Sequence, residues 1–234
     1  MSCARSSTSW RATDTSAPDR PPAPRELRSL GILGGTFNPP HLGHLAIAGQ
    51  ARSQLALEDV ALVPVGQPPH KAIEQDPGCA HRLAMCRLLV AGREGLSVCA
   101  LETEREGPSY TVDTLNFIHA SHPHAELTLI VGADVASTLP AWHEPERLLE
   151  LAALAVAARP GTGRRAVLEP LAALGGGARI GVEFLDSPVI DVSSSLVRER
   201  AAAGEPIDGL VGGAVAGYIA EHGLYGARVR AASR

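Results

Sequence analysis

One stretch near the start of the chain, residues 30–48 (LGILGGTFNPPHLGHLAIA), restricts the possible folds more than any other. It begins with a short apolar run, Leu30 to Leu33, of the length expected for a buried strand. Gly34 and Gly35 follow and predict a tight turn, and an apolar helical pattern starts beyond Pro40. The stretch therefore predicts a strand, a glycine turn and the beginning of a helix.

This order of elements suits the binding of a phosphate. Adjacent glycines let the backbone approach a ligand closely, and the N–H groups and positive dipole end of a helix start attract an anion. His41 and His44 are three residues apart, so both imidazoles of a first helical turn would reach one phosphate. The alternatives are a buried histidine pair or a metal site. Helical metal pairs more often have i, i+4 spacing with a third ligand nearby, so phosphate binding is favoured.

Further apolar runs alternate with helical patterns along the chain, which predicts βαβ units. We expect strands at residues 60–65, 96–101, 126–131, 152–158 and 180–185, and helices at 44–55, 81–90, 168–174 and 210–222, with another ending near 120. This pattern predicts an α/β fold, a doubly wound and mainly parallel sheet with a small C-terminal helical part. One domain would span residues 28–226, with disordered tails at residues 1–27 and 227–234.

A second phosphate-binding segment is predicted at residues 189–198 (VIDVSSSLVR). A strand ends there, the hydroxyls of Ser193, Ser194 and Ser195 offer a helix cap, and the helix start is another anion-binding terminus. Ser195 and Arg198 are three residues apart and share a helix face. Capping alone needs one serine, and Arg198 alone could be solvated, but together they suit the β- and γ-phosphates of a nucleotide.

Loops that leave the carboxyl ends of the predicted strands supply further candidates, because ligands gather at that edge of an α/β sheet. Lys71 is either a phosphate ligand or a solvated lysine, and Arg82 faces either a phosphate or solvent. Asp134, close to Gly132, either accepts hydrogen bonds from an amino or ribose group or caps a helix. Trp142 is either a core residue or a stacking face, and its place after a strand end favours the ligand site.

The loop at residues 102–114 is strongly marked by charged and hydroxyl side chains. It leads into the predicted helix that ends near residue 120. Ser109 or Thr111 would serve as the N-cap of that helix.

Composition narrows the classes of function. With 234 residues, 45% of them hydrophobic, and a formal net charge of -4, the chain can bury a core and has no general attraction for nucleic acid or anionic membranes. No apolar run approaches the ~20 residues that cross a bilayer. Four cysteines without zinc-site spacing indicate reduced thiols, so we expect a cytoplasmic protein.

The first 27 residues are rich in Ser, Arg and Pro. Their Arg and Ser content imitates a transit peptide, but Asp14, Asp19 and the prolines oppose an amphipathic helix. These residues are either a functional tail or the product of a misassigned start codon, and the sequence leaves both explanations open.

The segment GGTFNPPHLGH resembles the first signature of the HxGH nucleotidyltransferases. Together with PPHK, HRLAMCRLL, EGPSYTVDTL, VGADVASTLPAW, ARPG and VSSSLVRER, it resembles bacterial nicotinate-nucleotide adenylyltransferases over about residues 30–225. The resemblance implies a Rossmann-like nucleotidyltransferase fold. It also implies adenylyl transfer from ATP, with its Mg²⁺, to nicotinate mononucleotide, giving deamido-NAD and pyrophosphate in NAD biosynthesis.

The same resemblance implies site residues. His41, His44 and Arg198 would act on the ATP phosphates. ATP would also contact Gly34, Gly35, Thr36, Phe37, Gly132, Asp134, Ser194 and Ser195. The nicotinate nucleotide would contact Lys71, Thr111, Trp142, the backbone of His143, and Arg159. Three positions depart from the family pattern: Asn38 replaces a common Asp, Ser195 a usual Thr, and Val211-Gly-Gly a frequent Val-Pro-Pro helix start.

Two phosphate sites on one sheet, without a Ser/His/Asp set or a redox fingerprint, indicate phosphate chemistry by positioning. The expected partners are ATP and nicotinate mononucleotide, with no nucleic acid, no membrane and no metal site of the protein's own, in a monomer or homo-oligomer. Rival functions are adenylyl transfer to nicotinamide mononucleotide or phosphopantetheine, or a nucleotide sensor without turnover. The SYT stretch and Trp142 favour a flat aromatic acceptor, and the presence of both histidines opposes the sensor.

Overall fold

A single parallel sheet organises the protein. The computed structural model describes residues 27–69, 72–157, 164–172, 174, 181–186 and 191–227. Within these ranges six strands lie in the order β3-β2-β1-β4-β5-β6, and each pairing is parallel. The strands are β1 (Ser29–Gly35), β2 (Asp59–Pro64), β3 (Leu96–Val98), β4 (Glu126–Gly132), β5 (Ala153–Ala157) and β6 (Val182–Leu185). The predicted doubly wound α/β fold is confirmed.

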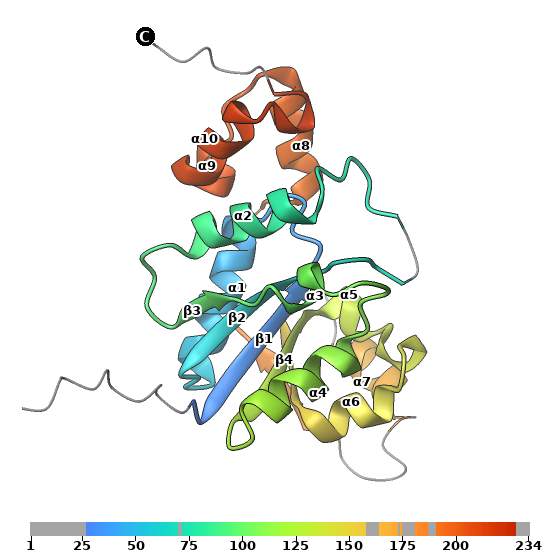
Figure 1. The fold of residues 1–234 in the computed structure, drawn as a ribbon. Helices are drawn as coiled ribbons and strands as arrows, with labels where there is room; N and C mark the ends of the chain where they lie inside the picture. The colour runs from blue at the N-terminus through green and yellow to red at the C-terminus, as the bar shows by residue number, and fades with distance from the viewer. Residues whose placement is uncertain are drawn as a thin grey trace, which may run out of the picture.

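Helices cover both faces of this sheet (Figure 1). One face carries α1 (Leu42–Gln54) and α2 (Cys79–Val90), and the other carries α4 (Thr111–Ser121), α6 (Pro145–Leu151) and α7 (Arg164–Ala172). Short helices α3 (Leu101–Glu104), α5 (Ala133–Ala136) and η1 (Leu139–Ala141) lie in the connections. The C-terminal part, beyond α2 in Figure 1, consists of α8 (Ser194–Ala203), α9 (Asp208–Val211), α10 (Gly213–Glu221) and η2 (Leu224–Gly226).

The strands are mostly apolar because successive side chains point to opposite faces and both faces are covered. In β1, Leu30 and Ile32 pack under α4 and α6, whereas Leu33 packs toward α1 and α2. In β4, Leu129 and Ile130 divide in the same way. This alternation explains why continuous apolar runs correctly predicted the strands.

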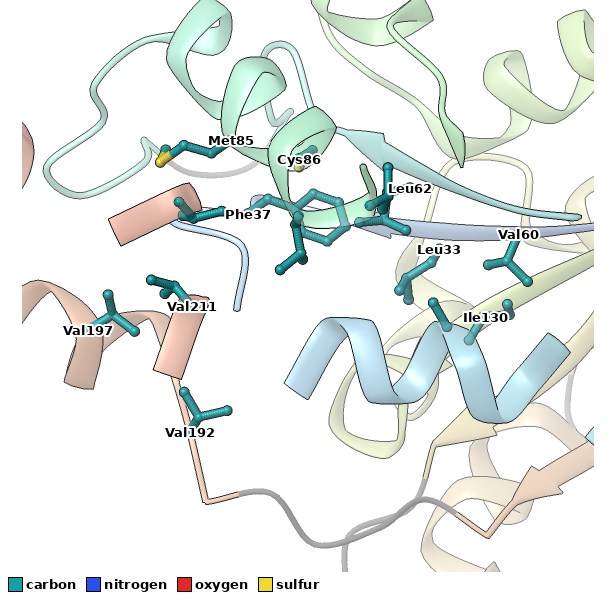
Figure 2. Close-up of a cluster of buried hydrophobic side chains, with 14 of the residues drawn as sticks. Leu33, Phe37, Val60, Leu62, Met85, Cys86, Ile130, Val192, Val197 and Val211 are labelled. Carbon is teal, nitrogen blue, oxygen red and sulfur yellow. The ribbon is translucent and has the colours of Figure 1, made fainter. Parts of the chain in front are cut away.

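The C-terminal helices share one of the two cores with the sheet. Figure 2 shows the buried side chains running from Leu33 and Ile130 on the sheet to Val197 and Val211 on the C-terminal helices. Phe37, which is 1% exposed, belongs to the same cluster. The second phosphate-binding segment is thus fixed to the sheet through a common core.

Three local predictions are wrong. The expected turn at Gly34 and Gly35 is strand, because both residues continue the register with Val63 and Pro64 of β2. The helix predicted at residues 210–222 is two helices, since the backbone of Gly212 has a φ of 82°. The strand predicted at residues 96–101 stops at Val98, and the helical turn α3 follows. Predictions about disordered ends stay predictions, because residues 1–26 and 228–234 lie outside the described ranges.

Candidate active site

The candidate site lies at the carboxyl ends of the central strands. The sheet order changes direction between β1 and β4, and ligands of doubly wound folds bind in the crevice beside such a switch point. The chain after β1 turns through residues 36–41 into α1, and that after β4 enters α5 directly at Ala133. Both predicted phosphate segments and the predicted acceptor residues follow strands of this edge.

The histidine pair sits at the start of α1. His41 is the N-cap, and its backbone N–H donates to Nδ1 of His44 at 3.1 Å. The two rings stack with centroids 3.7 Å apart. A Cβ on Gly43 would lie 3.0 Å from both the His41 ring and a methyl of Val192, so a side chain there would have to push one of these groups aside by a few tenths of an ångström. The prediction that both imidazoles lie on one side of the first turn is confirmed.

The electrostatic environment keeps His44 neutral. Burial lowers the pKa of His44 well below its usual value, and the neighbouring His41 lowers it further. Since Nδ1 of His44 accepts the backbone N–H of His41, the ring proton belongs on Nε2. The neutral ring is then a hydrogen-bond donor that needs no positive charge.

Phe37, which packs on Gly35, supports this histidine pair. A Cβ on Gly35 would lie 3.1 Å from the ring of Phe37, which contacts the His44 ring edge-on at 4.9 Å between centroids. Phe37 has a φ of 50° and its side chain is buried, so only its backbone could contact a ligand. The chain reversal that the glycines were expected to make occurs instead at residues 37–40, where the Asn38–Pro39 bond is cis.

The second segment meets the first one directly. Ser193 caps α8 by accepting the N–H of Leu196 at 3.1 Å. The hydroxyl of Ser194 donates to the carbonyl of Pro39 at 2.9 Å. Arg198 donates to the carbonyl of Asn38 at 2.8 Å, 160 residues away in sequence.

Arg198 also donates to the Ser195 hydroxyl at 3.2 Å, as their shared helix face predicted. A cavity of about 350 Å³ lies where the two segments join, lined by Thr36, Asn38, Ala72, Ile73, Glu74, Ser194, Ser195 and Arg198. The side chain of Arg198 is 13% exposed, and its nearest carboxylate is that of Glu74, at 3.9 Å on a largely exposed side chain. The cavity therefore combines a guanidinium, the three hydroxyls of Thr36, Ser194 and Ser195, and a weakly held counterion, which suits a polyanion.

Asn38, the position that departs from the family pattern, uses both ends of its amide. Its Nδ2 donates to the carbonyl of Glu74 at 2.6 Å, and its Oδ1 accepts the hydroxyl of Tyr225 at 2.8 Å. Burial raises the pKa of Tyr225, so the phenol keeps the proton that it donates. Asn38 thus joins the cavity wall to the C-terminal turn η2.

The predicted acceptor residues that the structure describes lie at the start of α4 and in the segment between η1 and α6. Thr111 is the first residue of α4, and the ring of the preceding Tyr110 lies 4.5 Å from that of His143. Trp142 is partly buried against the core under α4 and α6, and its indole donates to the Thr138 hydroxyl at 3.2 Å. Trp142 therefore serves at least in part as a core residue, one of the two alternatives that the sequence left open.

The remaining predicted positions are Asp134 with Gly132, the pair Lys71 and Arg159, and the two candidate N-cap residues of α4. Asp134 is exposed in α5, and a Cβ on Gly132 would lie 2.7 Å from its Oδ1, so the glycine admits this carboxylate. Lys71 and Arg159 lie outside the described residues. Neither Ser109 nor Thr111 caps α4, because the N-cap is Tyr110 and the Ser109 hydroxyl accepts backbone N–H groups of another loop.

The prediction that the Arg82 side chain faces a phosphate or solvent is wrong. The side chain is fully buried and donates to the carbonyls of Thr36, Val65 and Gly66, at 3.0, 2.6 and 3.3 Å. Asp76 is its carboxylate partner at 3.0 Å. Arg82 thus ties the loop after β1 to the loop after β2 instead of contacting a ligand.

Comparison with known proteins decides the family. The cytidylyltransferase-like family model matches residues 32–200. The chain is 42% identical over 199 residues to a protein of Thermomicrobium roseum named a probable nicotinate-nucleotide adenylyltransferase, covering 85% of this chain and 92% of that protein. A protein of the same name from Geobacillus kaustophilus is 40% identical over 208 residues, covering 89% and 91%. The chain belongs to the nicotinate-nucleotide adenylyltransferase family.

Solved structures agree with this family assignment at the level of fold. The nicotinic acid mononucleotide adenylyltransferase of Plasmodium falciparum complexed with NaAD has a TM-score of 0.69. It is 18% identical in sequence and covers 87% of this chain and 100% of its own. At that identity the likeness shows the nucleotidyltransferase fold alone.

Two further observations bear on the class of protein. Among the described residues, no helix has the length and apolar character needed to cross a bilayer. The described cysteines, Cys79, Cys86 and Cys99, form no disulfide.

Sequence reasoning missed the supporting roles of Tyr225 and Glu102 and misassigned that of Arg82. These residues hold neighbouring parts of the adenylyltransferase site in place through hydrogen bonds to other protein groups. The only signal in the sequence was the charge or hydroxyl itself, which gives no indication of its partners.

Proposed function

We propose that this protein transfers the adenylyl group of ATP to nicotinate mononucleotide, forming deamido-NAD and pyrophosphate. The family and its named relatives support this reaction. The single observation that carries it is the junction of the two phosphate segments, where Arg198 donates to Asn38 at 2.8 Å beside the cavity. A triphosphate in that cavity would contact the α8 terminus directly and would extend past the cavity lining to reach the histidine pair at the start of α1.

The proposed reaction is an in-line displacement at the α-phosphorus of ATP. A phosphate oxygen of nicotinate mononucleotide attacks that phosphorus, the new P–O bond forms the dinucleotide, and the bond to the β-phosphate oxygen breaks to release pyrophosphate. Negative charge grows on the oxygens in flight. The Nε2 proton of His44, the His41 ring and the guanidinium of Arg198 would stabilise it, each contributing roughly 10²- to 10³-fold if they act like oxyanion-hole donors.

Other residues would bind the two substrates. For ATP these are the backbone of Gly34, Gly35, Thr36 and Phe37, the helix start with Ser194 and Ser195, and Gly132 with Asp134 near the adenosine. For the nicotinate nucleotide we propose Lys71, Thr111, Trp142, the His143 backbone and Arg159.

Mg²⁺ would enter as part of the substrate MgATP. Among the described residues no three His, Cys, Asp or Glu side chains cluster closely enough to hold an ion. Phosphate oxygens and water would therefore supply most of the Mg²⁺ ligands, as is usual for this ion. We place the reaction in the cytoplasm, in agreement with the thiol state of the described cysteines.

The test is pyrophosphate release by the purified full-length chain. The assay uses ATP and Mg²⁺ with one acceptor at a time: nicotinate mononucleotide, nicotinamide mononucleotide or phosphopantetheine. We expect release with the nicotinate nucleotide, and none when ATP, acceptor or Mg²⁺ is omitted. Equal turnover of the amide would contradict the preference for the acid, and turnover of phosphopantetheine alone would contradict the proposed acceptor.

A further inference from the structure

A buried polar cluster lies beside the predicted acceptor residues. It consists of Glu102 in α3, Ser109 in the following loop and Thr114 in α4, with exposed fractions of 8%, 7% and 1%. Polar groups buried to this extent are normally fully hydrogen-bonded, and a satisfied network fixes one arrangement of the segments that contribute to it. None of the three residues has a role in the reaction as proposed above.

The hydrogen bonds of the cluster have a defined direction. The Thr114 hydroxyl donates to Oε1 of Glu102 at 2.7 Å. The Ser109 oxygen accepts the backbone N–H groups of Gly66 and Gln67, at 3.2 and 3.3 Å. These two bonds occupy the acceptor capacity of the serine, so its own proton is left for the Glu102 carboxyl group. Burial raises the pKa of Glu102, while hydrogen bonds from Thr114 and Ser109 lower it.

The cluster joins the loop after β2 to the segment that begins α4. The backbone N–H of Ser109 donates to the Gln67 carbonyl at 2.8 Å, and Gln67 and Pro108 form a parallel bridge. A Cβ on Gly66 would overlap the carbonyl oxygen of Glu102, so the two backbones are in direct contact. The two segments are therefore held as one unit with Glu102 at its centre.

Both segments lead to residues assigned to the acceptor. Tyr110, whose ring lies 4.5 Å from that of His143, and Thr111 follow Ser109 immediately. In the sequence, Lys71, which we assign to the acceptor, follows Gln67 of the loop after β2 by four residues. By contrast, the contacts that join the two ATP segments run from Ser194 and Arg198 to Pro39 and Asn38 and include no member of the cluster.

We propose that Glu102 is a positioning residue that, through Ser109 and Thr114, fixes the two walls of the acceptor pocket and thereby sets the affinity for the nicotinate nucleotide. This inference rests on the proposed function, because it assigns the walls to that acceptor.

An isosteric substitution separates the role of the carboxylate from its volume. In Glu102→Gln the amide NH₂ would face the Ser109 oxygen, whose lone pairs already accept Gly66 and Gln67. Satisfying the amide requires either breaking one of those bonds or turning the Thr114 hydroxyl away from residue 102 to the Tyr110 carbonyl, 3.4 Å away, and either change loosens the unit formed by the loop after β2 and the start of α4. Misplacement of a substrate-binding wall by about 1 Å can cost up to 10²-fold, so we expect a rise of about tenfold in KM for the nicotinate nucleotide.

The experiment compares Glu102→Gln with Glu104→Gln, an exposed glutamate on the same helix. Steady-state pyrophosphate release gives KM for each substrate separately, and thermal melting reports the fold. We expect Glu102→Gln to raise KM for the nicotinate nucleotide about tenfold and KM for ATP less than about twofold. Glu104→Gln should match the wild type. Equal rises in both KM values, or none, would overturn the inference.

A second pair of variants answers the question if Glu102→Gln does not fold. Thr114→Val removes the hydroxyl that donates to Glu102, and Thr114→Ser retains it. The inference requires a raised acceptor KM in the valine variant and a near-normal one in the serine variant; the same KM in both contradicts it. If the wild type does not turn over the nicotinate nucleotide, the proposed function is wrong. If the wild type turns it over and the variants have unchanged KM values, only the role of Glu102 is wrong.

Discussion

Replacing Arg82 by Met should destabilise the whole fold, because the guanidinium holds two ligand loops together from inside the protein. The side chain is fully buried and makes hydrogen bonds to three backbone carbonyls and to Asp76. Met fills a similar volume without donors. The variant would leave the carbonyls of Thr36, Val65 and Gly66 without this donor and the Asp76 carboxylate without its cation.

The expected loss follows from the partners. Removing one member of a buried ion pair costs about 3–5 kcal/mol, and each buried acceptor left unsatisfied about 1–3 kcal/mol, although such losses do not add fully. The Asp76 side chain is 32% exposed, so water can solvate its charge in part. We therefore expect a decrease of about 3–5 kcal/mol in the free energy of unfolding, a large share of the 5–15 kcal/mol typical of a domain.

Urea unfolding followed by circular dichroism measures this quantity. Arg87→Met, at an exposed position of the same helix, is the matched control and should stay within about 0.5 kcal/mol of the wild type. Arg82→Lys keeps the charge but not the planar fork, so its loss should be intermediate.

The contrary result is equally clear. If Arg82→Met unfolds at the wild-type urea concentration but has a strongly raised KM for ATP, Arg82 contacts the nucleotide and the structural role is wrong.

Three further predictions concern the site and its supports. Because the pKa of His44 is lowered in the folded state, the unfolded chain takes up a proton first as the pH falls below about 6.5, so the free energy of unfolding should decrease by up to about 1.4 kcal/mol per pH unit. Denaturant titrations at several pH values should show a weaker decrease of the unfolding free energy in His44→Gln than in the wild type. Identical pH profiles of the two proteins would refute this role of His44. Tyr225→Phe removes the hydroxyl bound to Asn38 and should lower the free energy of unfolding by about 1–2 kcal/mol; unchanged unfolding would mean that this bond contributes nothing. Glu74→Gln removes the exposed carboxylate near Arg198 and should lower KM for ATP about twofold at low salt but not at high salt, whereas a raised KM would show that Glu74 assists binding.

The fold was predictable from the sequence because a parallel sheet covered on both faces leaves a direct signal. The buried strands contain apolar runs, as in Leu154 to Ala157, and the helical patterns between the runs leave few possible topologies. The phosphate segments were predictable for a related reason. A helix start with a suitable cap is a local feature, and Ser193 does cap α8.

What could not be predicted depends on partners distant in sequence. Arg82 has the same appearance in the sequence whether it meets a phosphate or three carbonyls, and Glu102 seems a loop residue until α3 brings it against Ser109 and Thr114. Gly34 and Gly35 suggested a turn, but pairing with β2 extends the strand through both. Local propensity yields to such tertiary contacts.

The most direct measurement of whether the two phosphate segments act on one triphosphate is a double-mutant cycle on kcat/KM for ATP. It compares His44→Ala, Arg198→Ala and the double variant, with thermal melting as the check on folding. If one segment no longer binds the triphosphate, the triphosphate shifts and the other segment loses its contacts as well. We therefore predict that the loss of transition-state stabilisation in the double variant is much smaller than the sum of the losses in the two single variants. Losses that add within about 0.5 kcal/mol would contradict a shared site.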